Sequence, residues 1–381
     1  MSCSVIDPVQ LAQELIRCPS VTPLDEGAQD ILKNALTPMG FTCHDVPFGN
    51  IKNIYARIGT TGPHFSFCGH TDVVPPGDET RWTDPPFAAV IRDGVLYGRG
   101  AADMKSNIAC FVAAVSSYIA DHGAPRGSIS LLITGDEEAQ AVDGTVKVLQ
   151  WMADRGETPD VALVGEPTNP DYLGQEIKIG RRGSLTGRLT VKGVQGHTAY
   201  PQRADNPLPR LVKYLDALAG YTFDEGTEFF QPTNLQITTI DVGNPAANVI
   251  PGAGRATFNA RFNSLWSAAT LTAKIHELLD AVGPGYELHV ESNAESFITQ
   301  PGALSTIVVD AVQKVTGHAP ALTTTGGTSD ARFVQAHCPV VEFGLINKTI
   351  HKIDECAAIA DIEMLTAIYR KILEDYFPRL A

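Results

Sequence analysis

The sequence predicts an α/β protein in which a mostly parallel sheet is interrupted by a separate α+β domain. Three observations support this prediction. Short apolar runs alternate with helical patterns over the first 170 residues, the pattern changes between residues 181 and 293, and the α/β pattern resumes after residue 294. Such alternation is typical of strands joined by crossover helices. We therefore expect a discontinuous domain, 1–180 and 294–381, and an inserted domain, 181–293.

In the discontinuous domain, three apolar runs end in polar loops and are predicted to be buried strands: HFSFCGH, SISLLITGDEE and DVALVGEP. Helical patterns lie around 104–121 and 143–155. In AAVIRDGVLYGR, Asp93-Gly94 separates two apolar runs, which predicts a hairpin with a type I′ turn. Because functional loops of parallel sheets gather at the carboxyl ends of strands, we expect the polar loops to converge.

The inserted region follows a different order of elements: strand 184–193, helix 206–219, strands 234–242 and 253–262, helix 267–281 and strand 286–293. This β-α-β-β-α-β order is the ferredoxin-like arrangement, and the segment is long enough to fold by itself. The remaining chain returns to the first domain through four features: a helix at about 302–316, the Gly-rich TTTGGTSDARF, the apolar strand PVVEFGL and a terminal helix at about 358–376.

Composition limits the possible functions. A chain of 381 residues is too long for one ordinary core, which agrees with two domains. A hydrophobic content of 44% with 19% charged residues is typical of a globular protein. The net charge of −14 disfavours nucleic acid and anionic membranes, because both bind basic surfaces. An anionic substrate would therefore need locally placed arginines.

The amino terminus, MSCSVIDPVQLAQELIRC, lacks a basic region followed by an apolar run, and no segment reaches the roughly 18 apolar residues of a membrane span. We therefore expect a cytoplasmic protein. The seven cysteines include no C-x-x-C pair, so we expect reduced, mostly structural thiols and no thiolate zinc site. They are Cys3, Cys18, Cys43, Cys68, Cys110, Cys338 and Cys356.

Five potential metal ligands lie in separate turn-rich stretches: His70 in GHTDVVP, Asp103 in GRGAADMK, Glu138 in GDEEA, Glu166 in VGEPT and His351 in TIHKIDE. Two imidazoles and three carboxylates suit two zinc ions that share one bridging carboxylate. Each residue by itself is more often a surface carboxylate or a hydrogen-bonded core histidine. Their sequence contexts together favour a metal site, and such a site implies hydrolysis.

Asp72 follows His70 by two residues, so on an extended strand end both side chains point the same way. Asp72 can then accept a hydrogen bond from the ring nitrogen that His70 does not give to the metal. The alternative is an Asx-type turn in which Asp72 caps backbone groups, which the following Pro75-Pro76 also favours.

Glu137 and Glu138 are adjacent carboxylates after a predicted buried strand. They repel each other unless a cation takes one of them as a ligand, which leaves the other to act as a base. The alternative is a helix amino terminus, whose dipole favours Asp136, Glu137 and Glu138 in the first turn. The preceding strand and the other ligands favour the metal interpretation.

Two Gly-containing segments have alternative interpretations that fail. Gly98 and Gly100 precede a helix, but Asp103 replaces the third glycine of G-x-G-x-x-G and would repel a pyrophosphate. We interpret Asp103 as a metal bridge. GGTSDARF lacks the closing glycine of G-x-S-x-G, which argues against Ser329 as a nucleophile. We interpret that segment as a polar loop that binds substrate with backbone and hydroxyl groups.

Several of these segments together resemble the M20 dizinc metallopeptidase family, from about residue 7 to 375. They are GHTDVVPPGD, WTDPPFAAVIRDGVLYGRGAADMK, GDEEAQAVDGTVKVL, GEPT, GRRGSLTGRLTVKGVQGHTAYPQ, NVIPG, TGGTSD and NKTIHKIDE. The resemblance implies a zinc-exopeptidase-like catalytic domain, an inserted ferredoxin-like lid that forms a homodimer, and two Zn²⁺ per chain, with Co²⁺ as a possible ion in the second site. One departure is Ser106-Asn107, where the family usually has glycine and serine after MK.

The resemblance also implies roles for individual residues. His70 and Glu166 would hold one zinc, His351 and Glu138 the other, and Asp103 would bridge them. Glu137 matches the general base and Asp72 the acid that supports it, while His197 would cross a dimer interface to bind the oxyanion, with Asn248 and Tyr200 nearby. The remaining substrate contacts would be Arg182, Ser184, Arg261, Gly327, Thr328, Ser329 and Asn347.

Guanidinium groups bind carboxylates bidentately, so Arg182 and Arg261 fit an anionic N-acyl diamino acid as the substrate. The alternative for both arginines is solvated charge on the lid. Within the family, an acetylornithine deacetylase, aminoacylase or carboxypeptidase would share the zinc ligands and Glu137, and only lid contacts would differ. A catalytically inactive binding dimer is the non-enzymatic alternative, but it should have lost a ligand or the base, and this chain retains all of them.

Overall fold

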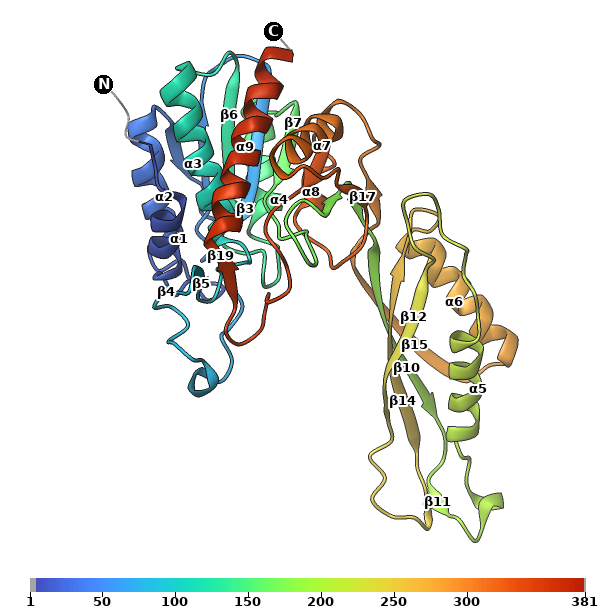
Figure 1. Ribbon diagram of the computed structural model, residues 1–381. Coiled ribbons are helices and arrows are strands. Elements are labelled where there is room, and N and C mark those ends of the chain that lie inside the picture. The colour runs from blue at the N-terminus through green and yellow to red at the C-terminus, as the bar shows by residue number, and fades with distance from the viewer. Residues whose placement is uncertain (1–4, 380–381) are drawn as a thin grey trace. The chain divides into compact units, whose positions relative to one another are not determined.

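The computed structural model describes residues 5–379. The chain forms two compact units (Figure 1). Unit 1 comprises the described chain up to Ile179, Thr299–Thr323 and the chain from Ser329 onward, and unit 2 comprises Gly180–Ile298 and Thr324–Thr328. The boundary of unit 2 therefore lies beyond 181–293 on both sides, and unit 2 includes a short piece of the Gly-rich segment. We describe each unit by itself.

An eight-stranded sheet forms the centre of unit 1, in the order β1-β2-β6-β3-β7-β18-β8-β17. Its central neighbours β6, β3, β7 and β18 run parallel, as do β8 and β17, whereas β1, β2 and the β18–β8 pair add antiparallel contacts. The predicted mixed α/β fold with a mostly parallel central sheet is confirmed. The strands are β1 (Thr42–Asp45), β2 (Ile54–Ile58), β3 (His64–His70), β6 (Ser128–Thr134), β7 (Val161–Val164), β8 (Glu176–Lys178), β17 (Ala321–Thr323) and β18 (Val340–Glu342).

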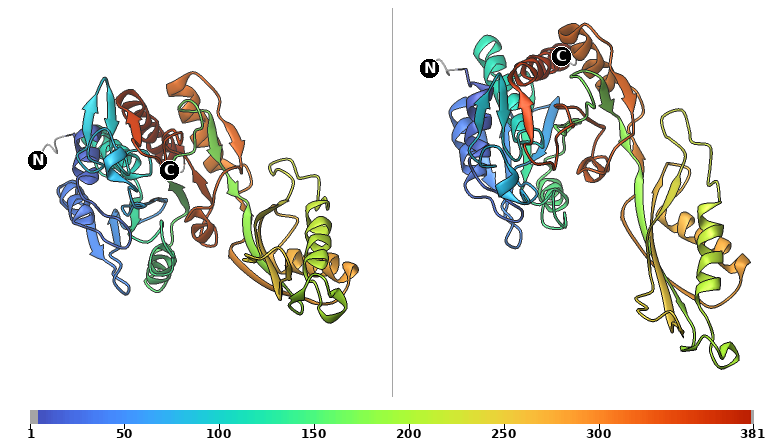
Figure 2. Two further views of the ribbon diagram at one scale, coloured as in Figure 1. Left: turned by 90° about the horizontal axis from the view of Figure 1, so that it is seen from below. Right: turned by 60° about the horizontal axis from the view of Figure 1, so that its bottom comes forward.

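The α-helices of unit 1 are α1 (Pro8–Ile16), α2 (Ala28–Leu36), α3 (Lys105–His122), α4 (Thr145–Ala153), α7 (Ala303–Thr316), α8 (Ala331–Val334) and α9 (Ile359–Arg379). Two 3₁₀ turns are η1 (Thr37–Met39) and η2 (Glu79–Arg81). Helices α3 and α9 pack side by side (Figure 2). Phe67 of β3 stacks on Phe111 of α3 with ring centroids 4.2 Å apart, and Tyr369 of α9 meets both rings edge-on. These contacts fix β3 against both helices and hold the strand that ends at His70.

A small antiparallel sheet in unit 1 has the order β19-β5-β4, with β4 (Val90–Arg92), β5 (Val95–Tyr97) and β19 (Cys356–Ala358). Strands β4 and β5 form the predicted hairpin. Asp93 and Gly94 have φ values of 51° and 76°, the positive values that a type I′ turn requires at both central positions. Strand β19 joins the chain near residue 356 to the segment that leads to Asp103.

Unit 2 contains a four-stranded antiparallel sheet in the order β12-β14-β10-β15. Its main elements follow along the chain as β10 (Gly183–Lys192), α5 (Leu208–Ala219), β12 (Asn234–Asp241), β14 (Ala253–Phe262), α6 (Ala268–Val282) and β15 (Tyr286–Ala294). Shorter elements are β9 (Gly180–Arg181), β11 (Gly196–His197), η3 (Pro201–Arg203), β13 (Val249–Ile250) and β16 (Phe297–Ile298), and they form the pairs β9–β16 and β11–β13.

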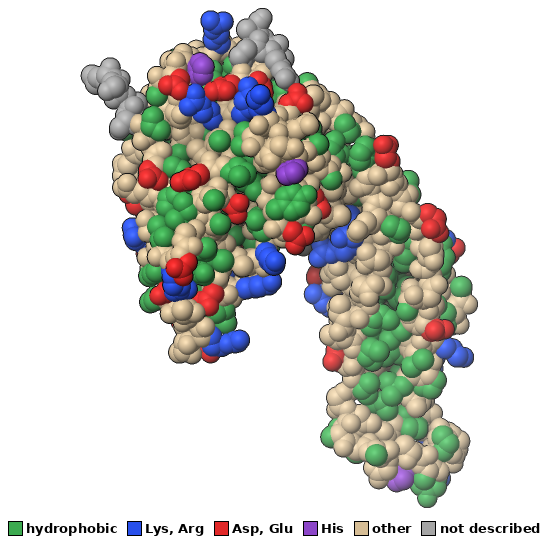
Figure 3. Space-filling view, viewed as in Figure 1, with side chains coloured by type: hydrophobic (Ala, Val, Ile, Leu, Met, Phe, Trp, Pro, Cys, Tyr) green, Lys and Arg blue, Asp and Glu red, His purple; other side chains and the backbone are tan. Residues whose placement is uncertain are grey.

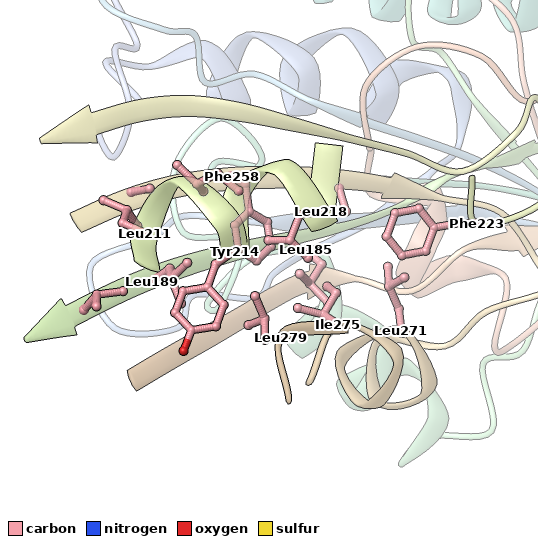
Figure 4. Packing of buried hydrophobic residues seen from close by; sticks show 14 of the residues in the cluster. Leu185, Leu189, Leu211, Tyr214, Leu218, Phe223, Phe258, Leu271, Ile275 and Leu279 are labelled. Carbon is pink, nitrogen blue, oxygen red and sulfur yellow. The ribbon is translucent and has the colours of Figure 1, made fainter. Parts of the chain in front are cut away.

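Alternation along the strands explains the core of unit 2. Leu185 and Leu189 of β10 and Phe258 of β14 point to one face, where Leu218 of α5 and Ile275 of α6 cover them (Figure 4). The opposite face of β10 carries polar side chains such as Arg188 and Lys192, which are exposed. A sheet with one apolar face and two helices can bury a core of its own.

The six cysteines among the described residues are free thiols, and Cys3 lies outside the described residues. Burial raises the pKa of the Cys68 and Cys110 thiols, which disfavours their reactive thiolate form. Between residues 5 and 379, none of the helices combines the length and apolar character needed to span a membrane.

Candidate metal centre

The candidate ligands converge because neighbouring parallel strands end at the same edge of the sheet. His70 is the last residue of β3, Glu137 and Glu138 follow β6, and Glu166 follows β7. Strand β3 lies between β6 and β7 and runs parallel to both. Asp103 lies two residues before α3, and His351 lies in the loop between β18 and β19.

Asp103 lies between two histidines that are far apart in the sequence. His70 Nε2 is 3.3 Å from Asp103 Oδ1 and 3.6 Å from Glu166 Oε1. His351 Nε2 is 3.4 Å from Asp103 Oδ2 and 3.1 Å from Glu138 Oε1. Each carboxylate oxygen of Asp103 therefore faces a different histidine, as a bridging carboxylate requires.

These residues fit metal ions. With bonds of about 2.0–2.1 Å, ligand atoms of a tetrahedral zinc ion lie about 3.3 Å apart, close to the contacts above. His70 Nε2 and Asp103 Oδ1 are buried and lack a hydrogen-bond partner of acceptable geometry among the described atoms. A buried polar atom without a partner is costly, and a cation between these two atoms would satisfy both.

Between residues 5 and 379, ligand atoms within 4.8 Å of one another form two triads, His70–Glu137–Glu166 and His70–Asp103–Glu138. Neither triad contains His351, although its contacts with Glu138 and Asp103 are as short as those of His70. The side chain of His351 is half exposed, and its Nε2 lies 3.1 Å from Glu138 and 3.4 Å from Asp103, which places it beside the second triad. Glu137 is close enough to be an alternative ligand.

The charged groups of the site shift one another's pKa values. Burial opposes ionisation of Asp103, but the interactions with the nearby His351 and His70 outweigh it and lower the pKa of Asp103. Asp103 and Glu138 raise the pKa of His351 to about 10. Burial, and then the charge of Glu166, raise the pKa of Glu137 well above its usual range. A carboxyl group with a raised pKa is suited to carrying a proton.

The contact predicted between Asp72 and His70 is wrong in detail. His70 Nδ1 hydrogen bonds with the backbone carbonyl of Asp72 at 2.9 Å, whereas Asp72 Oδ1 lies 3.7 Å away. Asp72 lies two residues beyond the end of β3, where backbone N–H groups of the loop after β6 are within reach of its carboxylate. The Asp72 carboxylate instead accepts the backbone N–H groups of Glu137 and Glu138, at 3.3 and 3.1 Å.

The helix-terminus interpretation of the acidic triplet is also wrong. Helix α4 begins at Thr145, and its first turn contains no acidic residue. Glu137 and Glu138 lie in the loop between β6 and α4, which Asp136 supports by accepting the N–H groups of Val142 and Asp143 at 2.9 and 3.0 Å. Hydrogen bonds from this loop to Asp72 and Asp136 hold the acidic pair at the sheet edge.

Four buried residues at the site were not predicted. Asn107, at the position that departs from the family, donates to the carbonyl of Ala102 and accepts the N–H of Leu345, both at 2.7 Å. Burial raises the pKa of Asp330 to about 6. Arg99 and Glu355 form a buried ion pair of 2.6 Å. Arg99 stands between two glycines and Glu355 ends the TIHKIDE motif, but neither pattern indicates burial.

The predicted substrate residues of unit 1 are Asn347 and Ser329. Asn347 lies in the loop that carries His351, where its backbone N–H donates to Asn169 at 2.8 Å. Ser329 is 1% exposed, and its hydroxyl donates to Glu342 at 2.8 Å. This contact holds the Ser329 side chain in the loop, and its role toward substrate stays a prediction. Gly327 and Thr328 belong to unit 2.

Arg182, Ser184 and Arg261 lie together in unit 2. Ser184 of β10 pairs with Arg261 of β14, and Arg182 directly precedes β10. Burial and the nearby charge of Arg261 lower the pKa of Arg182. The Arg182 guanidinium donates to the neutral side chain of Gln231 at 3.3 Å. Two neighbouring, half-buried cations are the arrangement expected of an anion site.

His197, Tyr200 and Asn248 form a second group in unit 2, beyond the other end of β10. The rings of His197 and Tyr200 lie 5.8 Å apart, and the carbonyl of Asn248 accepts the N–H of Thr198 at 3.0 Å. His197 is exposed. The ten residues of β10 separate this group from Arg182, which corresponds to roughly 30 Å of extended strand.

Comparison with known proteins places the chain in a family. Residues 67–375 match the model of peptidase family M20/M25/M40. A succinyl-diaminopimelate desuccinylase of Rhodospirillum centenum is 58% identical over 97% of both chains. One of Bradyrhizobium sp. is 52% identical over 97% of this chain and 99% of the relative.

Solved structures show the same fold. An M20 family metallo-carboxypeptidase from Sulfolobus solfataricus has a TM-score of 0.77 at 17% identity, covering 97% of this chain and 99% of the other. A dinuclear metal-binding peptidase of the M20 family from Bacillus subtilis has a TM-score of 0.71 at 14% identity, covering 97% and 98%. From the matched family and the near-full-length relatives, we conclude that the chain belongs to peptidase family M20/M25/M40.

Proposed function

We propose that this chain hydrolyses the amide bond of N-succinyl-LL-2,6-diaminopimelate and releases succinate and LL-2,6-diaminopimelate. The relatives that are 52% and 58% identical over nearly the full chain carry the name of this activity. The observation that carries the proposal is the placement of Asp103 between His70 and His351, with one carboxylate oxygen toward each. Such a diamino acid is a precursor of lysine and of peptidoglycan, so the proposed reaction is biosynthetic.

The proposed centre holds two metal ions. His70 and Glu166 would hold one, His351 and Glu138 the other, and Asp103 both. Zn²⁺ fits two imidazoles and three carboxylates, and Co²⁺ is an alternative for the second ion. When bound, the ions supply Lewis-acid chemistry, which acidifies water and polarises the amide carbonyl.

Glu137 is the proposed proton carrier. Its carboxylate takes a proton from the attacking water and delivers it to the amine nitrogen as the carbon–nitrogen bond breaks. Burial and Glu166 raise the pKa of Glu137, so its carboxyl group can hold that proton between the two steps. Asp72 accepts the backbone N–H of Glu137 and thereby orients the carrier.

Arg182 and Arg261 are the proposed partners of the substrate's carboxylates. Succinyl-diaminopimelate carries three carboxylates and one ammonium group, and burying such anions without cationic partners is costly. Arg261 of β14 is the cross-strand partner of Ser184 of β10, and Arg182 directly precedes β10. Gly327, Thr328 and Asn347 would add polar contacts from their loops.

We further propose that unit 2 is a ferredoxin-like lid that forms a homodimer. Its edge strand β12 pairs on one side only, and Ile240 of this strand is 60% exposed. Hydrophobic side chains lie along the visible face of this unit (Figure 3). Unpaired edges are suited to association with another strand. Because roughly 30 Å of β10 separates Arg182 from His197, one substrate molecule cannot contact both in the same chain. His197, with Asn248 and Tyr200, would therefore act in the partner's site by binding the oxyanion.

A panel of N-acyl amino acids tests this function. The purified protein, loaded with Zn²⁺, should cleave succinyl-diaminopimelate with a kcat/KM far above that for acetylornithine, which lacks the succinyl carboxylate and leaves an arginine unpaired. Comparable kcat/KM values for the two compounds would contradict the proposed substrate but not the proposed amidohydrolase activity. A protein that cleaves no amide in the panel would contradict the hydrolytic function itself.

A further inference from the structure

The buried pair of Arg99 and Glu355 joins the two chain segments that carry Asp103 and His351. The Glu355 side chain is completely buried, and its Oε2 accepts Arg99 Nη1 at 2.6 Å and the N–H of Gly100 at 3.1 Å. Its Oε1 accepts the N–H groups of Ala102 and Asp103 at 2.9 and 3.0 Å. One carboxylate thus holds the whole turn that ends at the bridging aspartate.

Arg99 extends the same connection to two other loops. Its Nη1 also donates to the carbonyl of Lys352 at 3.2 Å, and its Nη2 donates to Pro75 in the loop that follows His70 at 3.4 Å. The guanidinium carbon lies 5.3 Å from the centre of the Trp82 ring. A planar group with several donors can make these contacts simultaneously, whereas a lysine cannot.

The loop that carries His351 needs such support. His351 and Asp354 have φ values of 59° and 56°, a region that residues other than glycine rarely adopt. Strained backbone persists where the surrounding contacts determine it, and here hydrogen bonds from outside the loop add to those within it. Asp354 accepts the N–H and hydroxyl of Thr83 at 2.8 and 2.9 Å, and Glu355 is held as described above.

We propose that Glu355, held by Arg99, is a positioning residue that sets the distance between Asp103 and His351, and with it the affinity for the ion on the His351 side. This proposal rests on the dinuclear site of the proposed function. The ion on the His70 side depends less on the pair, because His70 and Glu166 are placed by β3 and β7 of the central sheet. The ion on the other side is held across two loops, which the pairing of β19 with β5 and the hydrogen bonds of the Glu355 side chain bring into register.

Stepwise titration of the metal-free protein with Co²⁺, followed by visible absorption and chelator competition, tests the proposal. His351→Ala and Glu166→Ala identify which step belongs to each side. In Glu355→Gln the neutral amide cannot accept all four donors. The Co²⁺ affinity of the His351-side step should therefore fall about 10- to 100-fold, and the fold-change in the affinity of the other step should be at least tenfold smaller. Glu355→Asp keeps the charge but has a shorter side chain, so it should also lower the Co²⁺ affinity of the His351-side step. If the Glu355→Gln protein does not fold, the Glu355→Asp protein is measured in its place.

Glu157→Gln is the matched control. Glu157 pairs with Arg57 and accepts the Tyr55 hydroxyl at 2.9 Å, near the amino-terminal end of β3 and away from the ligands. This variant should lower Tm without changing either Co²⁺ step. Lower Tm with unchanged Co²⁺ steps in the Glu355 variants, or equal weakening of both steps, would overturn the proposal. A wild-type protein that binds fewer than two Co²⁺ ions would instead contradict the dinuclear site itself.

Discussion

Asp72 Oδ2 accepts the backbone N–H of Glu138 at 3.1 Å, and the other oxygen accepts that of Glu137 at 3.3 Å. The Asp72 carboxylate is buried, and burial raises its pKa although these hydrogen bonds and His70 oppose the rise. One side chain therefore links the loop after β3 to the loop after β6, and it orients both the proposed proton carrier and a proposed metal ligand. A buried carboxylate that accepts two backbone N–H groups defines the course of both segments.

Asp72→Asn should lower kcat/KM about 10- to 100-fold, because an amide cannot accept both N–H groups and the loop with Glu137 loses its register. Steady-state kinetics and elemental analysis measure the effect. Asp25→Asn is the control, since Asp25 likewise accepts two backbone N–H groups, of Gly27 and Gln29, at the start of α2. Equal losses in both variants would show that Asp72 contributes only to folding.

Glu137→Ala should retain about two metal ions per chain and lose about 10²- to 10⁴-fold in kcat, because it removes proton transfer without removing a ligand. Glu138→Ala should instead lose the ion on the His351 side. Metal content by elemental analysis separates the two variants. Because Glu137 also lies within ligand distance of His70 and Glu166, metal loss in Glu137→Ala would reverse the two roles.

Mixing a His197→Ala chain with a Glu137→Ala chain should restore part of the activity if His197 acts in the partner's site. In the heterodimer, one site combines an intact Glu137 with an intact His197, whereas each homodimer lacks one of them in both sites. Differently tagged chains allow the heterodimer to be purified before the assay. A verified heterodimer without activity would remove the assignment in trans.

Arg182→Ala should depress kcat/KM for succinyl-diaminopimelate by at least about tenfold, because a substrate carboxylate loses a charged partner. Metal content should not change, since Arg182 and the candidate ligands belong to different units. Arg188→Ala, which removes an exposed arginine of the following strand β10, is the control. Equal effects of the two substitutions would favour the interpretation of Arg182 as solvated charge.

His64 gives a pH-dependent contribution to stability that is independent of the metal site. Burial, and then Arg57, lower its pKa to about 4, and its Nε2 hydrogen bonds with Ser130 at 2.7 Å. Between about pH 6.5 and pH 4, the unfolded chain binds a proton that the folded chain does not, so stability is lost as pH falls. The loss should be about 1.4 kcal/mol per pH unit in this window.

Chemical denaturation of the metal-free protein at pH 7.5 and pH 5 measures this contribution. His64→Gln removes the titrating ring and retains a nitrogen that can reach Ser130, so its stability should fall less over the same interval. Because all other groups are shared, the difference between the two slopes isolates His64. Parallel slopes would mean that His64 titrates in the folded protein as it does in the unfolded chain.

Local patterns in the sequence were sufficient to predict most elements of the fold. Apolar periodicity predicted β3, β6 and β7, whose ends carry the candidate ligands, and the periodicity of 253–262 matches β14 residue for residue. Asp93-Gly94 predicted its turn because both residues tolerate positive φ, a property of the residues themselves. The repulsion between two adjacent carboxylates is also the basis for giving Glu137 and Glu138 different roles, which stays a prediction.

Only the tertiary structure decided the partners of the buried polar groups. The hydrogen-bond partners of Asp72 are separated from it by 65 and 66 positions in the sequence. Those of Glu355 are more than 250 positions away. Periodicity reports whether a side chain is buried, but not which donors a buried carboxylate meets. Those donors depend on which loops the strand order brings to one edge of the sheet, and a buried charge must then find its partners there.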